Sequence, residues 1–466
     1  MSALDVKIMA ARAVGELARR AGRGGGTSLP GKVLMRLDAR AIERLAGRLP
    51  DGAAMVSATN GKTTTTAMAA TVLEHAGASL VANRAGANMS GGIASTLLGA
   101  AGRHETISGR LGLFEVDEFW LDRVAPALHP RAMLLGNLFR DQLDRYGELE
   151  TIADRWAALV AGLDHTQLAL NADDPLIADL GRERAGVSYF GVEDPAMAMA
   201  EMQHASDSKH CRRCGAAYVY EAIYLGHLGR YHCPNCGQRR PDPSVYATEI
   251  ELLGTRSARF ALHTPNGDAH VDLPLPGLYN VYNALGAATL CLKLGASFEQ
   301  VVAGLGAVSA AFGRAERIDV DGHELSILLI KNPAGANEIV RTLALEPGEL
   351  DLLGVLNDRT ADGRDISWIW DADFELLAGH VRRVTCAGTR AAELALRLKY
   401  AGVAPERLEV VPSLPPALDA ALASAGDSGL YALPTYTALL ELRQELSRRG
   451  HVNPYWSTRE PTPAAP

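Results

Sequence analysis

A phosphate-binding loop is the feature that most constrains the fold of this chain. Residues 53–58, Ala-Ala-Met-Val-Ser-Ala, are short and apolar enough to form a buried strand, and Thr-Asn-Gly-Lys-Thr-Thr follows at 59–64. In such loops, backbone N–H groups and a helix N-terminus hold phosphate oxygens. The generic motif would have glycine at position 56, where this chain has Val56. A threonine-rich helix start is the alternative, but the strand before the loop favours nucleotide binding and a helix over 64–76.

The residue types of the loop indicate what each could do at a nucleotide. Lys62 is expected to reach the β- and γ-phosphates, and the Thr63 hydroxyl to coordinate Mg²⁺. The expected nucleotide contacts are Thr59, Asn60, Gly61, Lys62, Thr63 and Thr64.

Short apolar runs alternate with helical segments along most of the chain, which predicts an α/β fold with a mainly parallel sheet. The expected strands of the first pattern lie at 53–58, 111–114, 133–136, 168–170, 245–253 and 258–263. A second α/β pattern follows, with strands near 325–330, 350–356, 383–386 and 408–411. The expected domains are an N-terminal helical segment (1–50), a central ATP-binding domain (51–312), a C-terminal α/β domain (313–456) and a disordered tail (457–466).

Four cysteines at metal-ligand spacing interrupt the first pattern. Two residues separate Cys211 from Cys214 and Cys233 from Cys236, and 18 residues lie between the pairs. This spacing is typical of a zinc ribbon, and four thiolates close the tetrahedral shell, so the zinc is expected to be structural. The predicted insertion covers 205–243. A catalytic zinc is disfavoured because it would need an open coordination position.

Composition excludes several classes of protein. The formal charge of -8 and the pI near 5.9 disfavour the broad basic surface of a nucleic-acid-binding protein. Cysteine usage fits a reducing compartment, and we expect a cytoplasmic protein. The first 21 residues have an amphipathic helical rhythm with arginines, which leaves open a peripheral contact with the inner face of the cell membrane.

Motifs across the chain resemble those of the Mur ligase superfamily, ATP-dependent enzymes that form amide bonds on cell-wall precursors or folates. The motifs that carry the resemblance are 59–64, Glu-Val-Asp-Glu at 115–118, Asn-Leu-Phe-Arg-Asp-Gln-Leu-Asp at 137–144, Asn-Ala-Asp-Asp-Pro at 171–175 and Pro-Gly-Leu-Tyr-Asn-Val-Tyr-Asn-Ala at 276–284. The resemblance implies catalysis with Lys62, a Mg²⁺ held by Glu115 beside Thr63, and a nucleotide near Asn280 and Asn283.

Three segments depart from the Mur ligases that add amino acids. Asp141-Gln142 replaces Asp-His, Tyr279-Asn280 replaces His-Asn, and residues 330–335 read Ile-Lys-Asn-Pro-Ala-Gly. These variants, the four-cysteine insertion and the stretch at 356–371 resemble the MurT family, the synthetase subunits of lipid II isoglutaminyl synthase. The resemblance implies that ATP activates the α-carboxyl of D-glutamate in the lipid II stem peptide as an acyl phosphate, and that ammonia converts it to D-isoglutamine.

The nitrogen donor is expected to come from another polypeptide. Cys291 lies in an apolar helical stretch, and Cys386 lacks the first glycine of a nucleophile elbow, so neither is typical of a glutaminase. The resemblance implies a GatD-type glutamine amidotransferase as partner, and an aspartate of this chain that orients the partner's histidine. Asp365 is the expected residue, with Asp371 and Asp362 as alternatives; Asp365 could instead cap a helix that begins at 366.

Two other functions remain open from the sequence. One is a Mur or folylpolyglutamate-type ligase that adds an amino acid, and the other is a zinc-ribbon ATPase that binds nucleic acid. Candidates to hold the D-glutamate carboxylate are Arg140, Asp141, Lys331 and Asn332.

Overall fold

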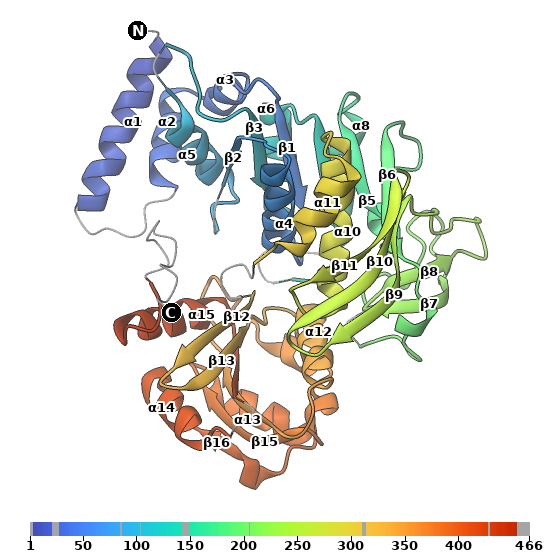
Figure 1. The fold of residues 1–466 in the computed structure, drawn as a ribbon, viewed down its shortest axis with the longest axis vertical. Helices are drawn as coiled ribbons and strands as arrows, with labels where there is room; N and C mark the ends of the chain where they lie inside the picture. The colour runs from blue at the N-terminus through green and yellow to red at the C-terminus, as the bar shows by residue number, and fades with distance from the viewer. Residues whose placement is uncertain are drawn as a thin grey trace. The chain divides into compact units, whose positions relative to one another are not determined.

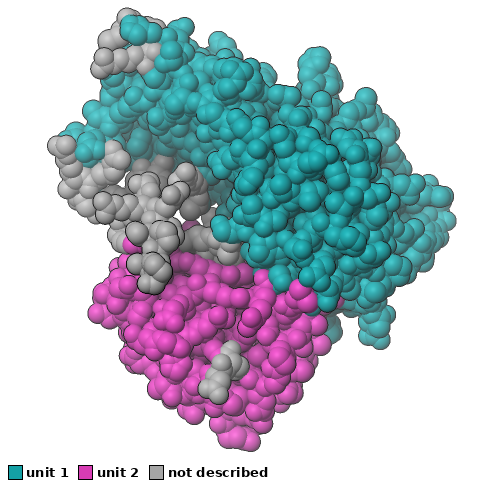
Figure 2. All heavy atoms as spheres, in the orientation of Figure 1, with its two compact units in different colours: residues 1–140, 147–252, 257–309 teal, residues 141–146, 253–256, 310–466 magenta. Residues whose placement is uncertain are grey.

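The structure, a computed structural model, describes residues 3–20, 28–83, 86–102, 104–141, 149–204, 206–309, 314–426 and 429–453. The chain divides into two compact units, coloured separately in Figure 2. Unit 1 comprises residues 1–140, 147–252 and 257–309, and unit 2 comprises 141–146, 253–256 and 310–466. The tail predicted at 457–466 lies outside the described residues.

Unit 1 is built on a nine-stranded sheet with the order β11-β10-β9-β6-β5-β4-β1-β3-β2 (Figure 1). Its strands are β1 (Ala53–Ser57), β2 (Leu80–Ala82), β3 (Leu111–Glu115), β4 (Ala132–Leu135), β5 (Gln167–Asn171), β6 (Val187–Val192), β9 (Val245–Leu253), β10 (Ser257–Thr264) and β11 (Gly267–Leu273). Neighbours from β2 to β9 pair in parallel, and β10 pairs antiparallel with β11. The phosphate loop therefore leaves the middle of a parallel sheet, at the edge where the strands end.

Helices cover both faces of this sheet (Figure 1). They are α1 (Ala3–Arg20), α2 (Leu29–Leu37), α3 (Ala41–Ala46), α4 (Lys62–His75), α5 (Ser90–Ala100), α6 (Leu121–Leu128), α8 (Leu149–Ala161), α9 (Pro175–Asp179), α10 (Leu278–Lys293) and α11 (Phe298–Gly306), with a 3₁₀ turn η1 (Pro195–Met197). Every residue of β1 and β3 is buried, which is why both read as continuous apolar runs.

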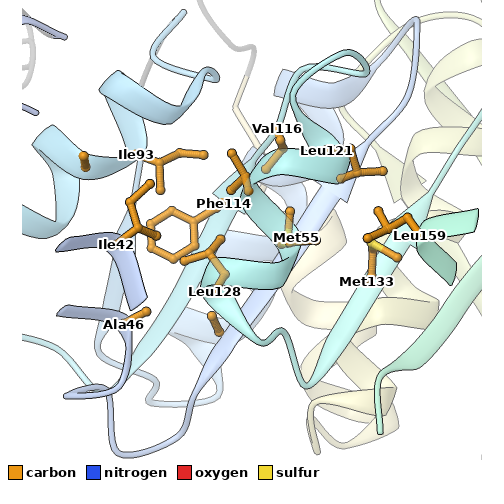
Figure 3. Close-up of a cluster of buried hydrophobic side chains, with 14 of the residues drawn as sticks. Ile42, Ala46, Met55, Ile93, Phe114, Val116, Leu121, Leu128, Met133 and Leu159 are labelled. Carbon is orange, nitrogen blue, oxygen red and sulfur yellow. The ribbon is translucent and has the colours of Figure 1, made fainter. Parts of the chain in front are cut away.

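Alternate side chains of β1 point to opposite faces of the nine-stranded sheet. Met55 points into a large apolar cluster with Phe114, Ile93 and Leu121 (Figure 3). On the opposite face α10 lies very close to the sheet, since a Cβ on Gly286 would stand 3.0 Å from Leu134. The N-terminal helices join the first face, because Leu4, Ile8 and Ala11 of α1 belong to the same cluster as Met55. The helices within the described ranges are each too short or too polar to serve as a bilayer-spanning segment.

The insertion of unit 1 contains a two-stranded antiparallel hairpin, β7 (Val219–Leu225) and β8 (Leu228–His232). Gly226 and His227 form its turn, and Gly226 has a φ of +58°, a backbone conformation that glycine adopts without strain. Three tyrosines of the insertion, Tyr218, Tyr220 and Tyr231, pack together with ring centroids 5.1–6.4 Å apart. The insertion therefore has a small apolar centre of its own.

Unit 2 contains a six-stranded sheet with the order β12-β13-β17-β14-β15-β16. Its strands are β12 (Arg314–Val320), β13 (His323–Leu328), β14 (Leu350–Val355), β15 (Val381–Ala387), β16 (Leu408–Val410) and β17 (Leu430–Pro434). Its helices are α12 (Pro333–Leu343), α13 (Ala391–Tyr400), α14 (Leu414–Ser424) and α15 (Tyr436–Arg448), with 3₁₀ turns η2 (Ser367–Trp370), η3 (Phe374–Leu377) and η4 (Pro405–Arg407). The predicted α/β class is confirmed, with a parallel sheet in each unit apart from antiparallel edge strands.

Candidate functional site

The phosphate loop joins β1 to α4, and glycine is required at its tightest point. Gly61 has a φ of +86°, in the left-handed region, and stands immediately before Lys62, the first residue of α4. A Cβ at this position would lie 2.0 Å from Oδ1 of Asn283. Both the backbone conformation and the neighbouring side chain therefore exclude larger residues at position 61.

Segment 137–140, which follows β4, holds the loop from one side. The Asn137 side chain accepts a hydrogen bond from the Asn60 amide at 2.9 Å and donates one to the Asn60 carbonyl at 3.0 Å. The Thr59 hydroxyl accepts from the Phe139 amide at 3.0 Å and donates to the Phe139 carbonyl at 3.3 Å. The loop conformation is therefore fixed through its neighbour strand as well as through its own sequence.

The N-terminus of α10 holds the loop from another side. The Thr65 hydroxyl donates to Oδ1 of Asn283 at 3.1 Å, and Asn283 donates to Oδ1 of Asn280 at 3.0 Å. Asn280 in turn donates to the Pro276 carbonyl at 2.7 Å. The structure thus brings Asn280 and Asn283 to the phosphate loop, where the resemblance places them.

Lys62 lies buried among acidic groups. Its ammonium group donates to the carboxylate of Glu118 at 2.7 Å and to the carbonyls of Ala58 and Thr59, at 2.5 and 3.2 Å. Burial alone would lower the pKa of Lys62, but Glu118, Asp117 and Glu115 outweigh that effect, so the pKa is raised. The lysine is therefore a permanent cation at the loop.

Glu115 ends β3 directly beside β1, since it pairs in register with Val56. Its carboxylate is buried and accepts a hydrogen bond from the Asn88 side chain at 3.0 Å. Asn83 fixes the Glu115 backbone through its amide and carbonyl groups. A buried carboxylate and the Thr63 hydroxyl are both hard oxygen donors, so the residues present fit a Mg²⁺ shared with a bound nucleotide.

The four cysteines of the insertion converge. Their Sγ atoms all lie within 4.8 Å of one another, with Cys211 and Cys233 buried and Cys214 and Cys236 exposed. Each pair sits on a matching turn, because Gly215 and Gly237 donate to the carbonyls of Cys211 and Cys233, at 2.7 and 3.1 Å. This all-thiolate set fits a closed tetrahedral zinc site, as the spacing predicts.

The three aspartates expected to serve a partner differ in exposure. Asp362 is buried and accepts from the Thr437 amide and hydroxyl at 2.7 and 2.5 Å, so its role is internal. Asp365 is exposed, and its Oδ1 accepts from the Ser367 amide at 2.8 Å at the start of η2. This bond, and then the Ser367 hydroxyl, lower the pKa of Asp365 and keep it ionised. Asp371 follows η2 and is half-buried.

The candidate ligands for the D-glutamate carboxylate are already engaged. Arg140 pairs with Asp207, and Lys331 donates to Asp141 at 2.5 Å within unit 2. Asn332 caps α12, since its side chain accepts from the Gly335 amide at 2.8 Å. A substrate carboxylate would have to compete with these contacts.

Sequence reasoning missed several residues that hold the loop and its acidic neighbours. Asn83 and Asn88 bind backbone or carboxylate groups and belong to no recognised motif. Asn137 begins the motif at 137–144, but its hydrogen bonds to the loop were not predicted. Glu118 belongs to the Glu-Val-Asp-Glu motif at 115–118, but its ion pair with Lys62 was not predicted. The available signal was its place after β3, because the ends of neighbouring parallel strands meet at one edge of the sheet.

Comparison with known proteins agrees with this geometry. Residues 56–236 match the Mur ligase middle domain, and residues 329–439 match the MurT ligase C-terminal domain. The subunit MurT of lipid II isoglutaminyl synthase (glutamine-hydrolyzing) from Streptococcus pneumoniae is 33% identical over 92% of this chain and 94% of that protein. Its counterpart in Staphylococcus aureus is also 33% identical, over 93% and 96%.

Other Mur ligases match a smaller part of the chain or match it at lower identity. UDP-N-acetylmuramate–L-alanine ligase of Chlorobaculum parvum is 30% identical over 54% of this chain, but only 42% of that enzyme is covered. Among solved structures, a pseudomurein peptide ligase of Methanothermus fervidus superposes with a TM-score of 0.66 at 22% identity, over 87% of this chain and 80% of that one, which shows a shared fold. The MurT proteins match this chain at 33% identity over nearly the whole length of both, and the chain therefore belongs to the MurT family of Mur ligases.

Proposed function

We propose that this chain is the synthetase subunit of a lipid II isoglutaminyl synthase. It uses ATP to activate the α-carboxyl of D-glutamate in the lipid II stem peptide and forms D-isoglutamine with ammonia from a glutaminase partner. Membership of the MurT family supports this function. The observation that carries it is Lys62, a buried cation held in a preformed phosphate loop beside the carboxylates of Glu118, Asp117 and Glu115.

The first step is phosphoryl transfer to the substrate carboxylate. A carboxylate oxygen attacks the γ-phosphorus of ATP, the new O–P bond forms, and the bond to ADP breaks. Lys62 leaves Glu118 to contact the phosphates, where its charge offsets the charge that spreads over the transferred group. Thr59 to Thr64 and the α10 residues Asn280 and Asn283 would form the nucleotide-binding surface. When Mg²⁺ is bound, it would be held by Thr63 and Glu115 and would supply further charge neutralisation.

The second step is amide formation. Ammonia attacks the acyl carbon, phosphate leaves with the bonding electron pair, and the nitrogen loses a proton. The chain's own thiols are poorly suited to release this ammonia from glutamine. Cys291 is fully buried in α10, burial raises the pKa of Cys386 to about 12, and the other four cysteines form the zinc set. A GatD-type glutamine amidotransferase partner is therefore part of the proposal.

An exposed aromatic surface that includes Trp370, five residues after Asp365, is suited to such a partner. Trp370 and Tyr400 are 50% and 71% exposed, their rings lie 5.8 Å apart, and Leu396 is exposed one turn before Tyr400 on α13. The guanidinium carbon of Arg397 lies 5.5 Å from the centroid of the Trp370 ring, within reach of a cation–π interaction. Exposed tryptophan and tyrosine are typical of interface anchors, and Asp365 on the same segment would orient the partner's catalytic histidine.

Reconstitution with and without a GatD-type partner tests the function. The readout is the mass of a lipid-linked precursor containing D-glutamate after incubation with ATP, magnesium and either glutamine or an ammonium salt. We expect amidation from ammonium with the chain alone and from glutamine only with the partner. A mass gain that corresponds to an added amino acid would instead support a ligase of the amino-acid-adding type. The predicted domain boundaries, 51–312, 205–243 and 313–456, stay proposals that limited proteolysis can check.

A further inference from the structure

We propose that the zinc ribbon positions the nucleotide-binding loop, and that His227 and Asp207 of the insertion are the positioning residues. Both act through segment 137–140, called here the bridge, which already holds Thr59 and Asn60 of the loop. The inference rests on the proposed function in one respect, that ATP binds at this loop.

His227 supports the bridge from the hairpin turn. Its ring centroid lies 4.6 Å from that of Phe139, with 51° between the ring planes, and the imidazole is fully buried. Gly226 approaches the same ring, since a Cβ there would lie 2.8 Å from Phe139 Cε1. The side chain of Phe139 therefore packs against the turn between β7 and β8, while the backbone amide of Phe139 donates to the Thr59 hydroxyl.

The bridge is held to the insertion by polar contacts as well. Asp207 accepts from the Arg140 amide at 2.9 Å and pairs with the Arg140 guanidinium. Asp174, at the start of α9, accepts from the Leu138 amide at 2.8 Å and lies 3.5 Å from Nε2 of His227. Consecutive residues of the bridge thus alternate between the phosphate loop and the groups around the hairpin.

The hairpin's position depends in turn on the cysteine cluster. His232, the last residue of β8, is adjacent to Cys233, and β7 begins shortly after Cys214. Small two-stranded units rarely hold their shape in water without a metal or a larger core. Zinc at the four thiolates would hold the hairpin in position, and the hairpin would in turn hold the bridge and the phosphate loop. Because coupling between two binding sites is reciprocal, zinc and ATP should each increase the other's affinity.

The test compares ATP affinity in hairpin variants by isothermal titration calorimetry with Mg²⁺ present. His227→Ala removes the ring beneath Phe139, and we expect the Kd for ATP to rise about 10-fold, within the usual range of coupling between sites. His227→Phe keeps a ring in that place and should stay within about 3-fold of the unmodified chain. Val219→Ala changes an exposed residue of β7 and serves as the matched control.

Two further measurements separate positioning from a general loss of structure. Zinc content is measured on the same samples, and amide hydrogen exchange is followed in the bridge and in β5. We expect zinc to be retained in His227→Ala, with faster exchange at 137–140 and unchanged exchange in β5. Asp207→Asn provides a second variant, which should weaken ATP binding in the same direction even if His227→Ala fails to fold.

Each outcome bears on the proposal. Unchanged ATP affinity in folded, zinc-loaded His227→Ala and in Asp207→Asn would overturn it. Equal weakening in His227→Phe and His227→Ala would contradict the role of the ring. Failure of the unmodified chain to bind ATP would instead overturn the proposed function, so the two failures are distinguishable.

Discussion

The phosphate loop of unit 1 and the Asp365 surface of unit 2 are built in opposite ways. Lys62 is 8% exposed, is paired with Glu118, and lies in a loop that the bridge and α10 hold in place. Asp365 is exposed five residues before Trp370, and Trp370 and Tyr400 are large aromatic side chains that are also exposed. The first region is buried and internally paired, whereas the second carries exposed aromatic side chains of the kind that is common at protein interfaces.

This difference indicates how the reaction is divided between proteins. Phosphoryl transfer needs positioned charge and the exclusion of water, and a buried site supplies both. Ammonia release needs an activated thiol, and the buried Cys291 and Cys386 do not fit that role. Variants of one region should therefore leave the chemistry of the other region intact.

Loss of Lys62 should have the largest effect. We expect Lys62→Ala to lower amidation by about 10³-fold or more with either glutamine or ammonium, because the charge on the transferred phosphoryl group is no longer offset. The measurement is the initial rate of precursor amidation with each nitrogen source.

The control for this variant addresses folding, since Lys62→Ala leaves Glu118 buried without its cation. The double variant Lys62→Ala with Glu118→Gln removes both charges and should be folded but equally inactive. Activity from ammonium in that double variant would refute the role of the lysine.

Asp365→Asn should separate the two regions. We expect glutamine-driven amidation to fall by about 10²- to 10⁴-fold, as when the aspartate of a catalytic triad loses its charge. Ammonium-driven amidation should be unchanged, because unit 1 is intact. Asp371→Asn is the matched control. If Asp371→Asn has the large effect instead, the assignment between the two residues is wrong.

Loss of the aromatic anchors should weaken the complex without affecting the chemistry. Trp370→Ala or Tyr400→Ala is expected to raise the Kd for the glutaminase by about 10- to 100-fold, the usual effect of losing an interface anchor. Surface plasmon resonance measures this affinity, and Val410→Ala, an exposed residue of β16, serves as the control. If the aromatic variants bind the glutaminase as tightly as the unmodified chain does, the interface lies elsewhere.

Zinc removal should have the smallest effect, and it should act on the phosphate loop of unit 1 alone. Chelation is expected to lower the glutamine-driven and ammonium-driven rates by the same factor, about 10-fold, because both need the phosphate loop. The ratio of the two rates should stay constant. A selective loss of the glutamine-driven rate would place the ribbon in the partner's function instead.

The sequence predicted several strands that are buried on both faces, but it missed β17, whose residues are also all buried. β1, β3, β4 and β5 are continuous apolar runs, as expected of central parallel strands. Strand β2 was missed because it has only three residues at the sheet edge. The hairpin of β7 and β8 was missed because its tyrosines and charged residues pack in a small metal-held module, where the hydrophobic pattern is weak.

The candidate site was predicted where a motif fixes the chemistry. The phosphate loop and the four cysteines each have a characteristic spacing, and the structure brings the members of each set together. Contacts made by single side chains could not be predicted. Asn137 and His227 reach the loop or its bridge from segments distant in sequence, so only the folded chain shows that they meet.

Nitrogen transfer by the chain in isolation tests most directly whether it activates the carboxylate but depends on a partner for ammonia. The purified chain is incubated with ATP, magnesium, a lipid-linked precursor containing D-glutamate, and either ammonium chloride or glutamine. We expect one ADP to be released for each precursor amidated from ammonium, and no glutamate to be released from glutamine. Glutamate release without a partner, or an absence of ATP consumption with ammonium present, would contradict this expectation.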